Sequence, residues 1–241
     1  MYYYFDINGT ILLSDAAGGK TTEQAVGQLV AQSIRLPDDT TLEDHIKTTV
    51  LEKKKQRETY LQVENYVEQH FPDLIEKVQE LLPKYTYLAR ETESRQGIFQ
   101  SFYEVVKYII ATDPQATIIL NTFGDDLPLV TRALGFPDGP WTDLEKLSLK
   151  DILTLNHDLL PAQVYAWKSS YQLWKGEGIG KPIFCDYESF FFDDNDTATV
   201  IDEYGITEDI PDHIHIFRVN TAEALSDPQY FVQRIRAAKK R

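Results

Sequence analysis

The chain has 241 residues, with 24 lysines and arginines against 38 aspartates and glutamates and a formal net charge of −14. An acidic surface repels nucleic acid and anionic membranes, so we expect neither as a partner. No apolar run approaches the length of a membrane span, which is about 18 residues. No signal-peptide pattern opens the chain, and the single cysteine cannot form an internal disulfide. We therefore expect a cytoplasmic protein.

The chain opens with a short apolar run that ends in a carboxylate. Tyr3-Tyr4-Phe5 has the character of a buried strand in a parallel sheet, and Asp6 follows at its carboxyl end, where ligand sites of open α/β sheets lie. Asn8-Gly9 can form a sharp turn, and Thr10 can hydrogen-bond back to hold the loop in one shape. The pattern predicts a functional carboxylate, although a strand that simply ends in a turn has the same appearance.

The segment of residues 17–94 has the spacing of helices. Apolar residues recur at three- and four-residue intervals, as in Tyr60, Val63 and Val67. Thr22-Glu23 and Pro72-Asp73 resemble helix starts, each with an acidic residue in the first turn. We therefore predict an inserted helical domain at residues 17–94, between core segments 1–16 and 95–241, with the small residues of Ser14–Lys20 as a hinge.

Two further apolar runs in the second half also end in polar residues. Ala116–Leu120 is followed by Asn121-Thr122, and Ser189–Phe192 is followed by Asp193-Asp194. Between the first two strands, Ile98–Ala111 has the pattern of a helix, which suits a crossover between parallel strands. We predict an α/β fold with a doubly wound parallel sheet, in which three strand ends form one composite site.

These motifs together resemble the haloacid dehalogenase superfamily. Its first motif is an Asp-x-Asp-x-Thr loop, its second a Ser or Thr after a strand, its third a lysine and its fourth an acidic pair after a strand. The resemblance covers about residues 1–13 and 97–220. It implies a Rossmann-like core sheet, and it identifies the helical insertion with a type-1 cap, a lid that closes over the site and selects the substrate.

The resemblance also implies a role for each site residue. Asp6 would attack phosphorus and form an aspartyl-phosphate. Thr122, with Asn121 beside it, would bind the phosphoryl oxygens of a phosphorylated small molecule or phosphoprotein. Mg²⁺ would be the cofactor. Its ligands would be the Asp6 carboxylate, the Asn8 backbone carbonyl and Asp194, with Asp193 alongside.

Three lysines lie between the second and fourth motifs and compete for the third position. We favour Lys181, because Gly178-Ile179-Gly180 before it and Pro182 after it place it in a turn near a core strand. There it would balance negative charge and keep Asp6 ionised. Lys168 and Lys175 are better explained as part of a solvated helix face.

One position departs from the family pattern. Phosphatases of the superfamily usually carry a second aspartate two residues after the nucleophile, and this chain has Asn8 there. An amide cannot relay a proton, and general acid–base catalysis typically raises the reaction rate by about 10²–10⁴-fold. We therefore expect a Mg²⁺-dependent phosphatase of low activity that favours good leaving groups. The alternative is a catalytically silent protein that binds a phosphorylated ligand or a protein partner.

Overall fold

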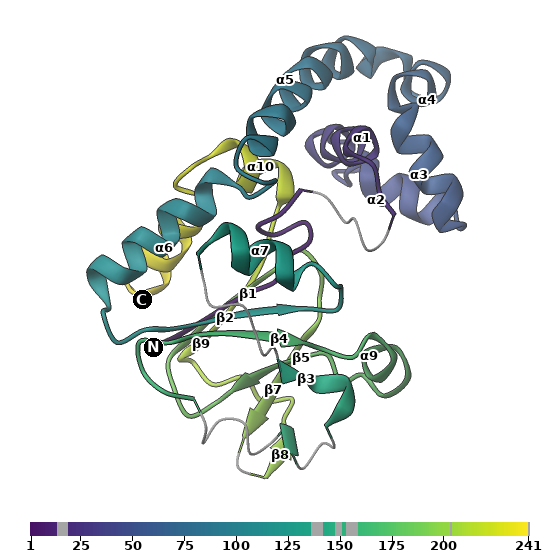
Figure 1. Cartoon of the computed structure of the whole chain (residues 1–241). Helices are drawn as coiled ribbons and strands as arrows, with labels where there is room; N and C mark the ends of the chain where they lie inside the picture. The colour runs from purple at the N-terminus through teal and green to yellow at the C-terminus, as the bar shows by residue number, and fades with distance from the viewer. Residues whose placement is uncertain (14–18, 136–141, 148–150, 153–158, 203, 241) are drawn as a thin grey trace.

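The computed structural model describes residues 1–13, 19–135, 142–147, 151–152, 159–202 and 204–240. In these residues a six-stranded parallel sheet lies beside a lobe of helices (Figure 1). The strand order is β3-β4-β2-β1-β6-β9, and every neighbouring pair is parallel. The predicted α/β class with a parallel sheet is confirmed.

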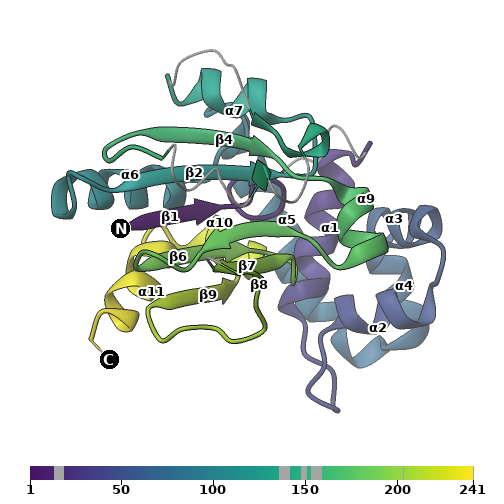
Figure 2. The ribbon, with the colours of Figure 1, turned by 90° about the horizontal axis from the view of Figure 1, so that it is seen from below.

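The sheet places three strand ends side by side. Its strands are β1 (Tyr2–Phe5), β2 (Thr117–Thr122), β3 (Thr142–Asp143), β4 (Val164–Lys168), β6 (Ser189–Asp193) and β9 (Ile214–Arg218). β1 lies between β2 and β6, as Figure 2 shows, and Phe5 is in register with both Leu120 and Phe192. Because parallel strands in register end at one edge, the loops that follow β1, β2 and β6 lie along that edge.

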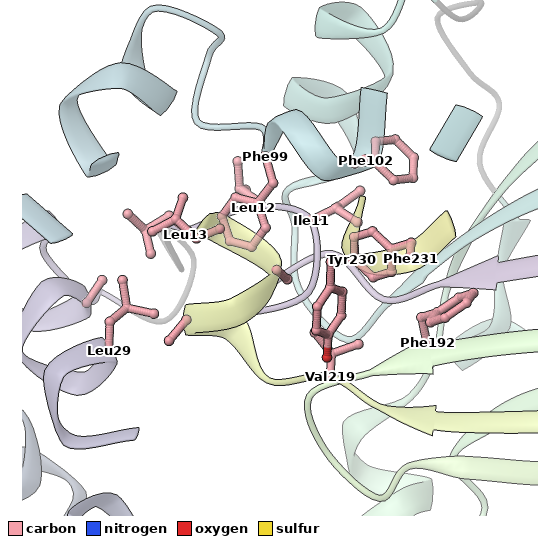
Figure 3. Packing of buried hydrophobic residues seen from close by; sticks show 14 of the residues in the cluster. Ile11, Leu12, Leu13, Leu29, Phe99, Phe102, Phe192, Val219, Tyr230 and Phe231 are labelled. Atoms are coloured by element: carbon pink, nitrogen blue, oxygen red, sulfur yellow. The ribbon is translucent and has the colours of Figure 1, made fainter. Parts of the chain in front are cut away.

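Helices cover one face of the sheet. Side chains alternate between faces along a strand, so Tyr3 and Phe5 share one face and Tyr2 and Tyr4 the other. The Tyr3 face packs against the helices α6 (Gln100–Thr112), α10 (Thr221–Ser226) and α11 (Tyr230–Ala238). Figure 3 shows Phe231 of α11 between Phe102 of α6 and Phe192 of β6, and the ring of Phe5 contacts all three.

A small second sheet covers the other face, an element that the sequence prediction did not include. It consists of β5 (Lys181–Phe184), β7 (Ala198–Asp202) and β8 (Gly205–Ile206). Tyr4 packs there with Trp167 of β4, which in turn meets Phe184 of β5 edge to face. Two short helices, α7 (Leu127–Ala133) and α9 (Tyr171–Glu177), follow β2 and β4, and a 3-10 turn, Leu144–Lys146, follows β3.

The lobe consists of helices from the segment between β1 and α6. They are α1 (Thr22–Ser33), α2 (Leu42–Thr49), α3 (Lys53–Leu61), α4 (Val63–His70), a 3-10 turn (Pro72–Leu74) and α5 (Ile75–Glu93). Thr21 and Thr41 begin α1 and α2 with reciprocal side-chain caps on Gln24 and Asp44, which satisfy backbone N–H groups that a helix start leaves free. Of the predicted hinge Ser14–Lys20, residues 14–18, and with them the predicted boundary at residues 16 and 17, lie outside the described residues.

The lobe and the sheet share one hydrophobic cluster. Figure 3 shows Leu12 and Leu13, from the loop after β1, between Leu29 of α1 and Phe99 at the start of α6. All four side chains are buried, so the loop that carries Asp6 also anchors the lobe. None of the helices in the described ranges is long and apolar enough to cross a bilayer.

A glycine in α1 tests how closely the lobe is packed. A Cβ atom at Gly27 would overlap the carbonyl oxygen of Tyr60 in α3, whereas a Cβ at Gly176 in α9 would meet open space. We expect Gly27→Ala to lower the free energy of unfolding by about 1–3 kcal/mol through overpacking. Gly176→Ala should raise it by up to about 1 kcal/mol, because alanine favours a helix. Urea denaturation measures both, and a Gly27→Ala protein as stable as wild type would contradict the close contact.

Candidate active site

A buried lysine lies between two carboxylates at the edge where β1 and β6 end. The Lys181 ammonium, on the first residue of β5, contacts Asp6 Oδ1 and donates to Asp193 Oδ2 at 2.7 Å. Lys181 is 2 % exposed, Asp6 4 % and Asp193 1 %. A lysine is almost never fully buried unless it is paired, so both carboxylates are needed to keep it there.

Burial and neighbouring charges shift the pKa values of the ionisable side chains at this edge. Burial raises the pKa of Asp6 well above its usual value; the Lys181 ammonium acts in the opposite direction. Burial and the neighbouring charge of Asp193 raise the pKa of Asp194 to about 7. For Lys181, burial lowers the pKa, but Asp6 and Asp193 outweigh it, so its pKa is raised and the lysine is charged. Three acidic groups thus crowd around one cation.

The loop after β1 brings Asp194 to Asp6. Thr10 Oγ1 donates to Asp6 Oδ2 at 3.3 Å and accepts from the backbone N–H of Asp194 at 3.1 Å, so one hydroxyl links the two loops. Gly9 adopts a φ of +78°, and a Cβ there would lie 2.5 Å from Asp194 Oδ2. Glycine is therefore required at this position for both its backbone angle and its missing side chain.

Asp193 is held from its other side by the loop that follows it. Its Oδ1 accepts from the backbone N–H of Asn195 at 2.8 Å, and its Oδ2 accepts from the Thr197 hydroxyl as well as from Lys181. With so many donors on it, the Asp193 carboxylate is fixed in place. The sequence prediction missed Thr197, whose only signal was a hydroxyl four residues after Asp193.

The loop after β2 brings Thr122 and Asn8 together. The Gly124 N–H donates to Thr122 Oγ1 at 3.0 Å, so the hydroxyl proton remains available to a ligand. Asn8 Nδ2 donates to Asp126 Oδ2 at 2.8 Å, while Asn8 Oδ1 is buried without a hydrogen-bond partner. Asp126 is itself buried. Sequence reasoning did not identify it, because a carboxylate four residues beyond a strand is common.

The structure separates the remaining predicted residues from this centre. Asn121 is fully buried and its Oδ1 accepts from the Ser169 hydroxyl at 2.7 Å, because adjacent strand residues face opposite sides. Lys168 is the last residue of β4, not part of a helix face, and pairs with Asp125 at 2.5 Å. Lys175 lies in α9 with its ammonium 4.0 Å from the centre of the Trp174 ring. Of the three lysines, Lys181 is the one at Asp6.

A cavity opens over these groups. Its volume is about 680 Å³, within the range of small-molecule sites. Asp6, Asn8, Thr122 and Lys181 line it from the sheet edge. Lys53 of α3 lines it from the helical lobe, so both parts of the fold contribute to the wall. The arrangement can hold a small anion against Lys181 and Thr122, with a carboxylate facing it.

Three carboxylates at the sheet edge have the chemistry of a site for a hard cation. One oxygen each of Asp6, Asp193 and Asp194 lies within 4.8 Å of the others. Mg²⁺ prefers oxygen ligands, and a divalent charge would offset the burial and the repulsion from Asp193 that together raise the pKa of Asp194. The residues present therefore fit the predicted ion.

Comparison with known proteins adds no identification. No family model matches the chain, and neither a curated protein nor a solved structure matches it. The fold and the arrangement of side chains are thus the basis on which a function is argued.

Replacing Lys181 tests how strongly the centre depends on it. We expect Lys181→Met to destabilise the fold by about 3–5 kcal/mol, because Asp6 and Asp193 would remain buried without their cation. Lys168→Met is the matched control, since its partner Asp125 is exposed and such pairs contribute about 1 kcal/mol or less. Urea denaturation of both variants measures the difference. Equal stabilities would show that the buried ion pairs are not required.

Proposed function

We propose that this protein is a Mg²⁺-dependent phosphatase of the haloacid dehalogenase type, with Asp6 as the nucleophile and the helical lobe as its cap. The observation that carries the proposal is the position of Asp6, at the end of β1 beside Lys181 and within reach of Asp193 and Asp194. The loop Asp6-Ile7-Asn8-Gly9-Thr10, the hydroxyl of Thr122 and the cavity above them support it.

The reaction proceeds in two displacements. A carboxylate oxygen of Asp6 forms a bond to phosphorus as the bond from phosphorus to the leaving oxygen breaks, and that oxygen takes the electron pair. The oxygen of a water molecule then forms a bond to phosphorus as the bond from phosphorus to Asp6 breaks. The electron pair of that bond returns to the Asp6 carboxylate, and the proton of the water passes to the released phosphate or to solvent. Mg²⁺, when bound, supplies positive charge that offsets the repulsion between the Asp6 carboxylate and the phosphoryl oxygens.

The other side chains position and neutralise the phosphoryl group. Thr122 donates its hydroxyl proton to a phosphoryl oxygen, since its oxygen already accepts from Gly124. Lys181 keeps a positive charge beside the attacking oxygen of Asp6. Asn8 donates a hydrogen bond but cannot give a proton to the leaving oxygen or take one from water. Turnover is therefore expected to be slow unless the leaving group departs without a proton.

An assay with good leaving groups tests this function. We expect the protein to hydrolyse 4-nitrophenyl phosphate and acetyl phosphate in the presence of Mg²⁺, and a chelator to abolish the activity. Asp6→Asn should reduce turnover to background, because the amide cannot form the phosphoenzyme. Asp209→Asn, a change at an exposed aspartate outside the site, is the control. Mass spectrometry of acid-quenched enzyme should find a phosphoryl group on the peptide that contains Asp6.

The same assay separates an enzyme from a silent binding protein. Absence of Asp6-dependent turnover, with phosphate still bound in a Mg²⁺-dependent manner, would favour the silent alternative. The observation that favours the silent alternative is Asn8, which stands where phosphatases of the superfamily usually carry an aspartate.

Restoring a carboxyl group at position 8 should extend activity to poor leaving groups. In Asn8→Asp, the new carboxyl would lie within hydrogen-bond distance of Asp126, to which it could donate its proton or from which it could accept one. We expect kcat/KM on an alkyl phosphate to rise by about 10²-fold or more, with a smaller gain on 4-nitrophenyl phosphate. The isosteric Asn8→Leu variant should not gain activity. An unchanged rate on the alkyl phosphate would rule out a missing acid as the cause of slow turnover.

A further inference from the structure

Three aromatic side chains form one wall of the active-site cavity. It consists of Phe123, from the loop after β2, and Tyr171 and Trp174 of α9. The rings of Phe123 and Trp174 are stacked, with centroids 5.4 Å apart and planes at 17°. Tyr171 meets both rings edge to face at 5.9 and 5.6 Å. The phosphoryl-transfer steps described above use none of these rings.

Two lysines converge on this wall from opposite parts of the fold. Lys53 is the first residue of α3 in the lobe, and Lys175 belongs to α9 of the core. Their ammonium groups are 5.9 and 5.8 Å from the centre of the Tyr171 ring. Both line the cavity, and neither has an ion-pair partner among the residues that the structure describes. In a chain with a net charge of −14, this is a local excess of positive charge.

Two rings of the wall are partly exposed to solvent. They are therefore accessible to a ligand and do not serve only to pack α9 against the sheet. The Tyr171 side chain is 41 % exposed and Trp174 is partly exposed, although both are large aromatic residues. The ammonium of the exposed Lys175 side chain lies 4.0 Å from the centre of the Trp174 ring. Flat rings bind to an exposed aromatic surface by stacking, and a nearby ammonium can pair with an anion on the same ligand.

The position of the wall relative to Asp6 decides which part of a substrate it meets. The Phe123 ring is the link, because the Lys181 ammonium that contacts Asp6 lies 4.9 Å from its centre. A phosphoryl group held at Asp6 and Thr122 therefore has the wall beside it, and the group attached to phosphorus extends along the cavity toward Tyr171. The cavity of about 680 Å³ has room for both parts of such a ligand.

We propose that the wall of Phe123, Tyr171 and Trp174, with Lys53 and Lys175, is a leaving-group subsite that selects small phosphate compounds with a planar ring and a second anionic group. The inference rests on the proposed function, because it assumes that the phosphoryl group binds at Asp6. It assigns specificity to α9 of the core together with the first residue of α3 in the lobe. A planar, electron-withdrawing leaving group also departs most easily without a proton. Such a substrate suits a site in which Asn8, and not a carboxylic acid, follows the nucleophile by two residues.

Non-hydrolysable phosphonates test binding separately from catalysis. Methylphosphonate, phenylphosphonate and 4-carboxyphenylphosphonate share the phosphoryl mimic and add first the ring and then the anion. By isothermal titration calorimetry with Mg²⁺, we expect the ring to tighten binding by about tenfold. The carboxylate should tighten it by about threefold more.

Variants assign each gain to its side chains. Trp174→Ala and, as a milder change at an exposed ring, Tyr171→Ala should each reduce the gain from the ring. The double variant Lys53→Gln/Lys175→Gln should remove the gain from the carboxylate and leave the gain from the ring. Lys54→Gln, at an exposed neighbour of Lys53 outside the cavity wall, and Tyr204→Ala, at an 88 % exposed tyrosine, are the matched controls.

The outcomes distinguish this inference from the function on which it rests. Equal affinities for the three phosphonates, in a protein with Asp6-dependent turnover, would overturn the subsite and leave the phosphatase standing. Gains that persist in the Trp174 and Tyr171 variants would also overturn it. If no phosphonate binds and no Asp6-dependent turnover is found, the phosphatase proposal fails and the subsite fails with it.

Discussion

The ammonium of Lys181, buried between Asp6 and Asp193, is the interaction on which the rest of the site depends. Removing a lysine from water is costly, and the contacts of the Lys181 ammonium with the two carboxylates and with the ring of Phe123 offset that cost. The interaction joins the ends of β1 and β6 to the first residue of β5, which lies in a different sheet. The small sheet therefore covers one face of the large sheet and also delivers the cation.

The parallel register explains why so many acidic groups meet. Since β1 lies between β2 and β6, the residues after these three strands share one edge of the sheet. The carboxylates of Asp6, Asp193 and Asp194 come within 4.8 Å of one another there. Burial there makes the charged carboxylates unfavourable, and Thr10, Thr197 and backbone N–H groups compensate in part. The remaining excess of negative charge, with a raised pKa at Asp194, is the feature of this centre that the proposed Mg²⁺ would offset.

In the proposed function, the groups that react and the groups that select the substrate come from different parts of the fold. Asp6, Thr122 and Lys181 lie at the sheet edge, whereas Tyr171 and Trp174 lie on the short helix α9 and Lys53 lies on the lobe. The lobe joins the sheet through the same loop that carries Asp6, and Leu12 and Leu13 bury that loop against α1 and α6. Contacts between lobe and sheet can thus influence the position of the loop that carries Asp6.

The ends of these strands could be predicted from the sequence because each strand is a short apolar run followed at once by polar residues. Asp6, Thr122 and Asp193-Asp194 could be predicted as one site from that local pattern, and Lys181 from the turn around it. The pattern of polar residues after a strand does not say which way each side chain points. Asn121 and Thr122 show this, since one hydrogen-bonds to Ser169 within the fold and the other lines the cavity.

The sequence by itself determined the α/β class, the parallel strands and the helical segment between them, because hydrophobic periodicity acts over a few residues and is independent of distant neighbours. Only the tertiary structure decided the partner of Asn8, the second sheet on the Tyr4 face and the meeting of Lys53 with Tyr171. Asn8 and Asp126 are 118 residues apart in the chain, and no local pattern encodes such a contact. Packing of the whole core brings them together, so burial and register, rather than spacing, determine the site.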